Sequence, residues 1–336
     1  MNICICGGGN LGHVCSGWLA MQSDFHVRVL TRHPERWSRE ICLTLPNREK
    51  VKSLLSCVTS DTEEALKDAE ILLLCLPGFA IEEELKRISP YITSKMYVGS
   101  IVSSTGFFLM AKKILPSQTK LFGFQRVPFI ARIEEYGHSA SLLGYKSSLS
   151  LATLHVKDSA YICRLMEQMF KVPVKILGNY WEATLSNSNP ILHPCRLYSL
   201  FGGGQTKNAV YDYRPFFYED WDDNSSELLL ACDMEFQQLL HVLGIPQAIP
   251  SLLEYYECEN AHALTRKIRS IDAFKGLKAP MIETREGKFV PDYGNRYFVE
   301  DIWYGLRFIY ELMKKHRMKS PNIDKVYEWG MSVLPK

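Results

Sequence analysis

The sequence contains no CxxC pair, no long apolar run and no large excess of charge, and each absence disfavours a class of protein. Its ten cysteines are scattered, several within apolar runs such as NICIC and ILLLCLP, where cysteine behaves as a small buried hydrophobic residue. This distribution disfavours a disulfide framework or a zinc site and suits a reducing compartment. We therefore expect no structural metal.

Signals for membrane insertion, export and nucleic-acid binding are also missing. The longest apolar run, ILLLCLPGFAI, is too short to span a bilayer. A glycine-rich loop begins at residue 7, which leaves no room before it for a signal peptide. The formal net charge of +2 gives no basis for a nucleic-acid or membrane-surface partner. We expect a cytoplasmic protein that acts on small molecules and that could form a homodimer through an apolar helical domain.

The length of 336 residues exceeds what one hydrophobic core usually serves, and this predicts two domains. The first half alternates short apolar runs with amphipathic stretches, which predicts a mostly parallel sheet with helices on both faces. Strands are predicted at 2–6, 26–31, 71–77, 96–102, 119–124, 148–154 and 172–177, and helices at 10–21, 79–89, 105–114 and 158–171.

The pattern of apolar residues changes after Gly178, where short strand-like runs become rare. Helical patterns follow at 225–243, 247–270 and 299–317. The predicted fold is therefore α/β: a Rossmann-like dinucleotide-binding domain over 1–178, followed by a mainly α-helical substrate and catalytic domain over 179–336.

The first loop, Gly7-Gly8-Gly9-Asn10-Leu11-Gly12, satisfies G-x-G-x-x-G between a predicted strand and a predicted helix. Gly7 permits a tight turn, Gly9 lets the backbone approach a pyrophosphate, and Gly12 lets helix and strand pack closely. The helix N-terminus at Asn10 and Leu11 offers N–H groups and partial positive charge to phosphates. A plain glycine turn is the alternative, but the flanking elements favour a dinucleotide site.

The second predicted strand ends in VRVLTRHPERW and lacks the acidic residue with which an NAD-preferring site holds the ribose 2′-hydroxyl. Thr31 and Arg32 stand in its place, and Arg36 follows one turn later. A hydroxyl and two guanidinium groups suit a 2′-phosphate. NADP(H) is therefore favoured, and NAD(H) is the alternative, because a solvated basic loop would tolerate both cofactors.

The segment CLPGFAI places Leu76 and Pro77 directly after a predicted strand. Ligands of open sheets lie beyond the carboxyl ends of the strands. We expect these two residues to flank the nicotinamide half of the cofactor, with an ordinary strand-to-helix turn as an equal alternative.

The segment SNSNPILHPCR (186–196) holds His193 between Pro190 and Pro194. Proline disfavours the α region for the residue before it, which predicts a stiff, irregular turn around His193 and not a regular helix. This histidine follows the predicted boundary, where we expect the two domains to face each other. A dehydrogenase needs a group that transfers a proton, and histidine suits that task. His193 is our candidate, and a simple bend in the chain is the alternative.

The segment GNRYFVEDIWYGL (294–306) offers Arg296, Glu300 and Asp301 at the start of the last long predicted helix. A carboxylate could orient His193, and Arg296 could bind a substrate carboxylate. The alternative is that the acidic residues only complement the helix dipole.

Together with GFQRVPFIAR (123–132), these segments resemble the octopine/nopaline (opine) dehydrogenase family over nearly the whole chain. The resemblance implies a dinucleotide domain joined to an α-helical domain. It implies NAD(P)H-dependent reductive condensation of a 2-oxo acid with the amine of an amino acid, through an imine. It also implies that His193 transfers the proton, with Asp301 and Arg296 completing a triad. In the family pattern a proline follows the Glu-Asp-aliphatic run, whereas this sequence has Trp303 at that position. The substrate pocket is therefore the part expected to differ.

The implied reaction suggests further substrate contacts. Gln125 and Arg126 follow the strand at 119–124 and are candidates for the 2-oxo acid, with a structural loop as an equal alternative. The aromatic and acidic segment YDYRPFFYEDWDD (211–223) could line an amine pocket, but a packed loop is the stronger interpretation. Two other functions stay open: an NADPH-dependent 2-oxo acid or ketone reductase, and a non-catalytic nucleotide-binding protein.

Overall fold

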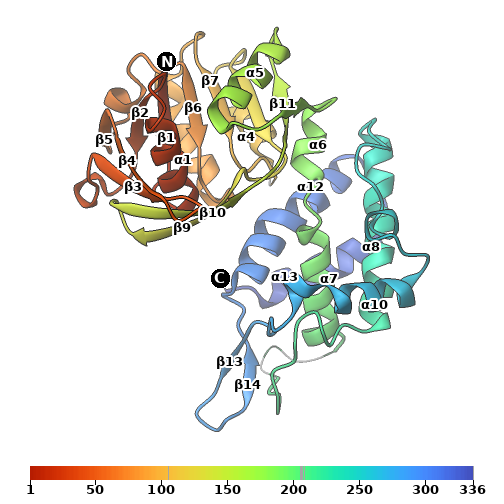
Figure 1. Cartoon of the computed structure of the whole chain (residues 1–336). Coiled ribbons are helices and arrows are strands. Elements are labelled where there is room, and N and C mark those ends of the chain that lie inside the picture. Colours follow the sequence, from red (N-terminus) through yellow and green to blue (C-terminus); the bar gives the residue numbers. More distant parts are fainter. Residues whose placement is uncertain (105, 205–206, 208, 336) are drawn as a thin grey trace. The chain divides into compact units, whose positions relative to one another are not determined.

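The computed structural model describes residues 1–104, 106–204, 207 and 209–335. The chain divides into two compact units, Met1–Ser186 and Asn187–Lys336, coloured red to green and green to blue in Figure 1. Within the described residues, no helix is both long enough and apolar enough to cross a membrane.

The first unit is built on an eight-stranded sheet with the order β12-β11-β8-β7-β6-β1-β2-β5 in the described residues. Neighbouring strands are parallel except β8 and β11, which are antiparallel. The strands are β1 (Asn2–Cys6), β2 (His26–Leu30), β5 (Cys57–Thr59), β6 (Ile71–Leu74), β7 (Tyr97–Ser100), β8 (Lys120–Phe124), β11 (Leu149–Leu154) and β12 (Val174–Ile176). β1 lies inside the sheet between β6 and β2, so the glycine-rich loop leaves the sheet from an interior strand.

Helices cover both faces of this sheet, as predicted. Alternate residues of β1 point to opposite faces: Ile3 and Ile5 pack with α1 and α5, and Cys4 and Cys6 pack with α2, α3 and α4. The helices are α1 (Asn10–Ala20), α2 (Thr62–Leu66), α3 (Gly78–Ile88), α4 (Phe107–Ile114) and α5 (Ser159–Phe170), with the short 3₁₀ turns η1 (Pro34–Arg36) and η2 (Ser89–Tyr91). Thr105, the first residue of the predicted helix 105–114, lies outside the described residues.

A second, smaller sheet with the order β4-β3-β10-β9 was not predicted. Its strands are β3 (Glu40–Thr44), β4 (Lys50–Leu54), β9 (Phe129–Glu135) and β10 (Ser139–Tyr145). They pack against α1 (Figure 1) and bury residues such as Ile41, Leu43 and Leu142 in the same core. The helix that starts at the glycine-rich loop is therefore covered by sheet on two sides.

The first unit ends eight residues beyond the predicted boundary near Gly178. Helix α6 (Tyr180–Leu185) begins with a capping box between Asn179 and Glu182. Its Ala183 is buried, and α6 packs against β11, β8 and α4. Because this helix packs on the first unit, the division falls between Ser186 and Asn187.

The second unit is mainly helical, as predicted. It contains α7 (Asn189–Phe201), α8 (Asp223–Val242), α9 (Leu252–Tyr256), α10 (Ala261–Ser270), α11 (Arg296–Phe298), the π-helix η4 (Val299–Leu306), α12 (Arg307–Lys315) and α13 (Pro321–Val333), with the 3₁₀ turn η3 (Asp272–Phe274) and the hairpin β13 (Met281–Glu283) and β14 (Phe289–Pro291). Helix α7 packs against α8, α13 and η4, and this makes it the central element of the unit (Figure 1).

Two helical predictions in this unit are corrected. The stretch 247–270 is not one helix, because Glu257 takes a left-handed conformation (φ 56°) that ends α9, and Asn260 caps a new helix. The stretch 299–317 begins as a π-helix and not as an α-helix. Its predicted apolar face is nevertheless buried at Ile302, Leu306 and Ile309.

Candidate active site

The glycine-rich loop has a steric reason for each glycine at its ends. Gly7 has φ +124°, and a Cβ there would lie 2.6 Å from the carbonyl oxygen of Cys75. A Cβ on Gly12 would collide with the carbonyl oxygen of Gly7. At Gly9, by contrast, no atom lies within 4 Å of the Cβ position. The loop is thus closely packed at Gly7, against the end of β6, and at Gly12, and it is open in front of Gly9.

The N-terminus of α1 suits an anionic group. Gly9 is the N-cap residue of the helix, and no side chain caps the first turn. The N–H groups of Asn10 and Leu11 can therefore donate to a bound anion. The Asn10 side chain is turned aside, because its Oδ1 accepts a hydrogen bond of 2.8 Å from the Ile133 N–H. The residues present therefore fit the pyrophosphate of a dinucleotide.

His13 supports this loop, a role that sequence analysis did not assign. Its Nδ1 donates to the Gly9 carbonyl oxygen at 3.0 Å, and its Nε2 accepts the Gly137 N–H at 2.7 Å. The ring is buried and lies 4.1 Å from the Trp37 ring, centroid to centroid. Burial lowers the pKa of His13, so the neutral ring joins the glycine-rich loop to the β9–β10 turn.

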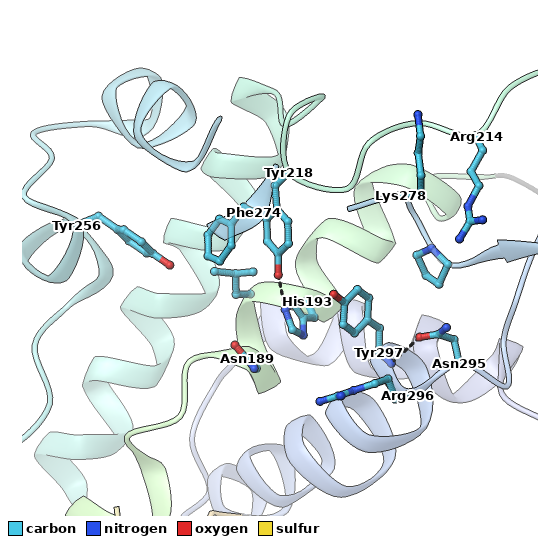
Figure 2. A pocket seen from close by; sticks show the side chains of 12 residues that line it. Asn189, His193, Arg214, Tyr218, Tyr256, Phe274, Lys278, Asn295, Arg296 and Tyr297 are labelled. Atoms are coloured by element: carbon cyan, nitrogen blue, oxygen red, sulfur yellow. Dashed lines mark hydrogen bonds between the residues drawn. The ribbon is translucent and has the colours of Figure 1, made fainter. Parts of the chain in front are cut away.

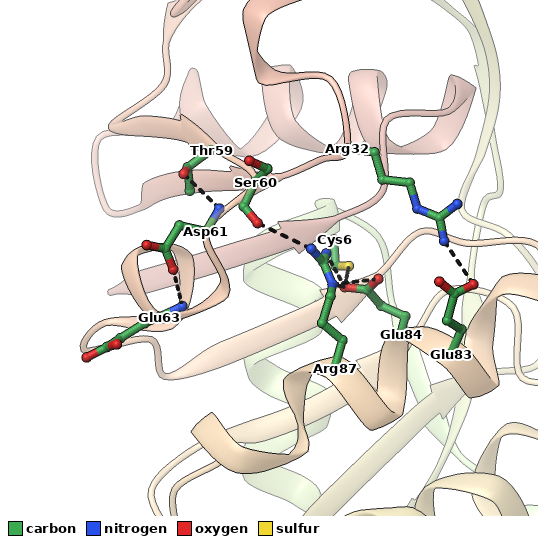
Figure 3. Close-up of polar contacts among 9 residues, drawn as sticks. All are labelled: Cys6, Arg32, Thr59, Ser60, Asp61, Glu63, Glu83, Glu84 and Arg87. Carbon is green, nitrogen blue, oxygen red and sulfur yellow. Dashed lines mark hydrogen bonds and ion pairs between the residues drawn. The ribbon is translucent and has the colours of Figure 1, made fainter.

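The three residues predicted to hold a 2′-phosphate follow β2. Thr31 is buried, and its Oγ1 lies 2.8 Å from the position that a Cβ on Gly8 would take. Arg32 is exposed and pairs with Glu83 of α3 at 3.1 Å (Figure 3). The Arg36 guanidinium lies 4.4 Å from the centre of the Tyr136 ring. The basic side chains are present, but one of them already has an acidic partner.

A buried cluster fixes the end of β1, from which the glycine-rich loop departs. The Cys6 thiol donates to Oε1 of the buried Glu84 at 3.1 Å, and Arg87 binds the same carboxylate at 2.6 Å (Figure 3). Arg87 also donates to the Ser60 carbonyl oxygen. Burial, together with the Glu84 charge, raises the pKa of Cys6. This thiol is therefore a structural hydrogen-bond donor.

The other candidates of the first unit lie at turns that follow strands. Leu76 contacts the loop, since its Cδ2 is 3.0 Å from the Cβ position of Gly7, and Pro77 is the N-cap residue of α3. The Gln125 backbone N–H donates to the Ser150 carbonyl oxygen. The Arg126 guanidinium donates to the Ser186 carbonyl oxygen at 3.0 Å, so this side chain holds the last residue of the unit.

The prediction of an irregular turn at His193 is wrong, because His193 lies inside helix α7. Pro190 stands in the first turn, where a missing N–H costs nothing. Pro194 lies inside the helix and removes one hydrogen bond, at a cost of roughly 3 kcal/mol. Burial of Ile191, Cys195 and other side chains on several sides of α7 offsets that cost.

The His193 ring is held at both nitrogens. Nδ1 lies 2.7 Å from Oδ2 of Asp301. Nε2 lies 2.8 Å from the Tyr218 hydroxyl, a contact that Figure 2 shows. His193 is 5% exposed. With Asp301 as a carboxylate, Nδ1 carries the hydrogen and Nε2 accepts the Tyr218 O–H. Burial raises the pKa of Tyr218, so this hydroxyl stays a donor.

Close packing of η4 on α7 brings Asp301 to His193. A Cβ on Gly305 would lie 2.8 Å from two ring carbons of Pro190, so only glycine permits this approach. On the far side of η4, a Cβ on Gly330 of α13 would lie 2.8 Å from Ile302. π-helical segments are rare and often occur at functional sites.

Tyr218 is positioned by a buried arginine of the same helix as His193. Arg196 is 1% exposed and donates to the carbonyl oxygens of Phe217 and Asp220 and to the Ser225 hydroxyl, at 2.9, 2.6 and 2.9 Å. Burial lowers its pKa to about 10, which leaves it charged at neutral pH. The Tyr218 ring also stacks on Phe274, with 4.1 Å between centroids.

His193 opens onto a cavity of about 440 Å³ within the second unit (Figure 2). Arg296 lines it, as do Arg214, Lys278 and several aromatic side chains. Arg296 is exposed and lies 3.9 Å from Glu300, so its acidic neighbour is not Asp301. Trp303 does not line the cavity and lies against the Arg307 guanidinium at 4.8 Å.

Sequence analysis missed Tyr218, Arg214 and Lys278 as cavity residues. Tyr218 and Arg214 belong to segment 211–223, for which the sequence favours a packed loop over an amine-pocket wall, and both residues line the cavity. The density of aromatic side chains in this segment was the available signal. Within the described residues, no cluster of histidine, cysteine, aspartate and glutamate could hold a metal ion.

Comparison with known proteins follows the same two units. The profile of the family "NAD/NADP octopine/nopaline dehydrogenase, alpha-helical domain" matches residues 176–334. The profile "Ketopantoate reductase PanE/ApbA" matches residues 3–128. Octopine dehydrogenase of Mizuhopecten yessoensis is 28% identical over 100% of this chain and 90% of its own length. Over its full length the chain is homologous to octopine and opine dehydrogenases, at 26–28% identity. It is an opine dehydrogenase-like, NAD(P)-dependent oxidoreductase.

Solved structures of opine dehydrogenases share the whole fold. A structure of octopine dehydrogenase with NADH and L-arginine superimposes with a TM-score of 0.88, at 25% identity over 99% of this chain and 89% of that chain. Yersinopine dehydrogenase with bound NADP⁺ has a TM-score of 0.75 and 13% identity, over 99% of this chain and 90% of that chain, and shares the fold alone. Members with this architecture thus bind NADH in one case and NADP⁺ in another.

Proposed function

We propose that this enzyme reductively condenses a 2-oxo acid with the amine of an amino acid, through an imine. The observation that carries this proposal is the His193 ring, held between Asp301 and Tyr218 at a cavity lined by cationic side chains. The full-length likeness to octopine dehydrogenase supports it.

His193 acts as the general acid and base of the reaction. Loss of water from the amine adduct of the 2-oxo acid requires a proton on the departing oxygen. Reduction of the resulting imine gives a secondary amine, with the hydride supplied by NAD(P)H. Asp301 stabilises the imidazolium form of His193 through Nδ1. Nε2 faces the reacting group once the Tyr218 hydroxyl no longer donates to it. Arg296 binds a carboxylate of the 2-oxo acid.

The first test removes the histidine. We expect His193→Ala to lower kcat by roughly 10²–10⁴-fold, because a positioned acid–base group contributes that much. Asp301→Asn should give a smaller loss. The dissociation constant of the reduced cofactor, measured by fluorescence titration, should stay close to the wild-type value in both variants. Turnover of His193→Ala within a few-fold of the wild type would refute the assignment.

The cofactor preference proposed here is NADP(H), with NAD(H) as the alternative. Thr31, Arg32 and Arg36 support it, since a hydroxyl and two guanidinium groups suit a 2′-phosphate. Glu83 limits it, because its carboxylate pairs with Arg32. We expect Arg32→Ala to lower the NADPH/NADH ratio of kcat/KM, and Glu83→Gln to raise it. If neither variant changes the ratio, these residues do not select the cofactor.

A second candidate function is reduction of a 2-oxo acid or ketone without any amine. The match of residues 3–128 to the ketopantoate reductase profile favours it. NADPH oxidation with a 2-oxo acid, measured with and without amino acids and with mass detection of the product, separates the two functions. An absolute requirement for the amine supports the opine reaction. Binding of cofactor without turnover on a broad substrate panel would instead indicate a nucleotide-binding protein.

A cytoplasmic location is part of this proposal. All ten cysteines are unpaired in the described chain, which suits a reducing compartment.

A further inference from the structure

Among the residues that the structure describes, three cationic side chains and no carboxylate line the cavity at His193. Arg214, Lys278 and Arg296 contribute the charges, and apart from the His193 ring the other lining residues are neutral. The backbone bridge between Phe216 and Lys278 places the segments of Arg214 and Lys278 side by side. Arg296 comes from the separate helix α11 and lines the same cavity as His193 (Figure 2).

Two of these cations have no acidic partner within the described part of the chain. The Arg214 Nε donates to the Ala279 carbonyl oxygen at 2.7 Å. This hydrogen bond fixes the orientation of the guanidinium through its Nε atom. The Lys278 ammonium lies 3.2 Å from the centre of the Phe216 ring. No carboxylate of the described residues lies within 4 Å of either group. Glu300 lies 3.9 Å from Arg296, which is too far for a hydrogen bond, so the N–H groups of Arg296 also stay available to a ligand. Arg214 and Lys278 are therefore available to an anionic ligand.

The number of charges restricts the substrates. A 2-oxo acid and a neutral amino acid bring one carboxylate each, and Arg296 and one other cation would balance them. The third cation stays unmatched. A substrate with a guanidinium or ammonium side chain would meet like charges and would find no carboxylate on the cavity wall, an arrangement that specific sites use to reject a ligand.

Building on the proposed function, we propose that the amine substrate is a dicarboxylic amino acid. Its reacting amine lies at His193, and its two carboxylates bind Arg214 and Lys278. The carboxylate of the 2-oxo acid binds Arg296. The terminal N–H groups of Arg214 suit a bidentate carboxylate. Arginine-like and amine-only substrates are excluded by charge.

The first experiment compares amines in the wild-type enzyme, with pyruvate as the fixed 2-oxo acid. Glutamate, aspartate, alanine, arginine and agmatine are tested. We expect kcat/KM for glutamate or aspartate to exceed that for alanine by about tenfold, the value of one additional charge-assisted contact. Arginine and agmatine should be poorer than alanine. A preference for arginine or agmatine would overturn the proposal.

A second comparison asks which substrate carries the additional carboxylate. Pyruvate with glutamate is measured against 2-oxoglutarate with alanine, since both pairs contain three carboxylates. The proposal requires the first pair to have the higher kcat/KM. A higher value for the second pair would assign the third charge to the 2-oxo acid and would overturn the assignment made here.

Variants connect this preference to the residues. We expect Arg214→Gln to lower the glutamate/alanine ratio of kcat/KM by about tenfold, and Lys278→Gln to lower it in the same direction. General structural damage would lower both substrates equally and would leave the ratio unchanged. Arg285→Gln removes an exposed charge of the β13–β14 turn, outside the cavity, and is the matched control. An unchanged ratio in both cavity variants would overturn the proposal. If Arg214→Gln fails to fold, Lys278→Gln alone tests the proposal, because the Lys278 side chain is exposed.

The same assays distinguish failure of this inference from failure of the proposed function. If a 2-oxo acid is reduced without any amine, the proposed function fails and this inference fails with it. If an amine is required but a cationic or neutral one is preferred, the proposed function stands and only the inference fails.

Discussion

At the scale of single residues, the site is defined by a histidine with both ring nitrogens occupied. Asp301 accepts from one, and the Tyr218 hydroxyl donates to the other. Because burial raises the pKa of Tyr218, its hydroxyl does not ionise in the working range of an enzyme. In the proposed reaction the substrate therefore competes with Tyr218 for the same nitrogen, and the tyrosine keeps the ring aligned until the substrate binds.

Tyr218→Phe tests this positioning role. We expect kcat to fall by about tenfold, since one hydrogen bond that orients the acid–base group is lost, while cofactor affinity is kept. Tyr218 and Asp301 act through the same ring, so the double variant with Asp301→Asn should lose less than the product of the single losses. Strictly multiplicative losses in kcat would show that the two residues act independently.

At the scale of elements, catalytic geometry depends on how closely η4 packs on α7. Gly305 and Pro190 meet with no room for a Cβ. Asp301 is part of the same π-helix as Gly305, and His193 is part of the same helix as Pro190. A small separation of the two helices would therefore lengthen the contact between Asp301 and His193 directly.

Gly305→Ala makes this prediction measurable. We expect a loss of about 1–3 kcal/mol in the free energy of unfolding, which is typical of an overpacked site, and a fall in kcat that exceeds any change in cofactor affinity. Gly294→Ala is the control, because a Cβ there would meet only Asp292 Oδ1 at an ordinary 3.5 Å. Wild-type kcat and stability in Gly305→Ala would contradict the account of helix packing.

At the scale of the whole molecule, the alternation of strands and helices and the glycine motif were enough to predict the class of fold. The predicted core strands and helices are present within a few residues, because apolar runs such as NICIC have no alternative to burial. The small sheet was missed. Its strands carry polar and charged residues on the outer face, as in FIARIEE. Their apolar residues are buried by packing against α1, a contact that the local sequence does not indicate.

The site was predictable only in part, for two physical reasons. The His193 and Asp301 segments carry distinctive residues, and the structure brings them together at 2.7 Å. The backbone around His193 was mispredicted, because tertiary burial of α7 outweighs the local effect of Pro194. Tyr218, Arg214 and Lys278 belong to irregular segments without periodicity, and their contribution depends on contacts between distant parts of the chain.

The pH dependence of stability should reflect His13. Burial lowers its pKa below the ordinary 6.5, so the unfolded chain takes up a proton before the folded chain does. The contribution of the neutral His13 ring to the free energy of unfolding is therefore fully present above pH 6.5 and is lost as pH falls below that value. We expect Tm to decrease between pH 7.5 and 5.5, and the decrease to be smaller by a few degrees in His13→Gln, which does not titrate. Equal decreases in both proteins would rule out His13 as the cause.

The hydrogen bonds of Arg196 have a consequence for changes in the length of the chain before Phe217. They fix Phe217 and Asp220 to the helix that carries His193, so the position of Tyr218 does not depend on the chain that leads up to it. We therefore expect insertions or deletions in the segment before Phe217 to change the wall of the cavity, of which Arg214 is part, and to leave the contact between Tyr218 and His193 in place.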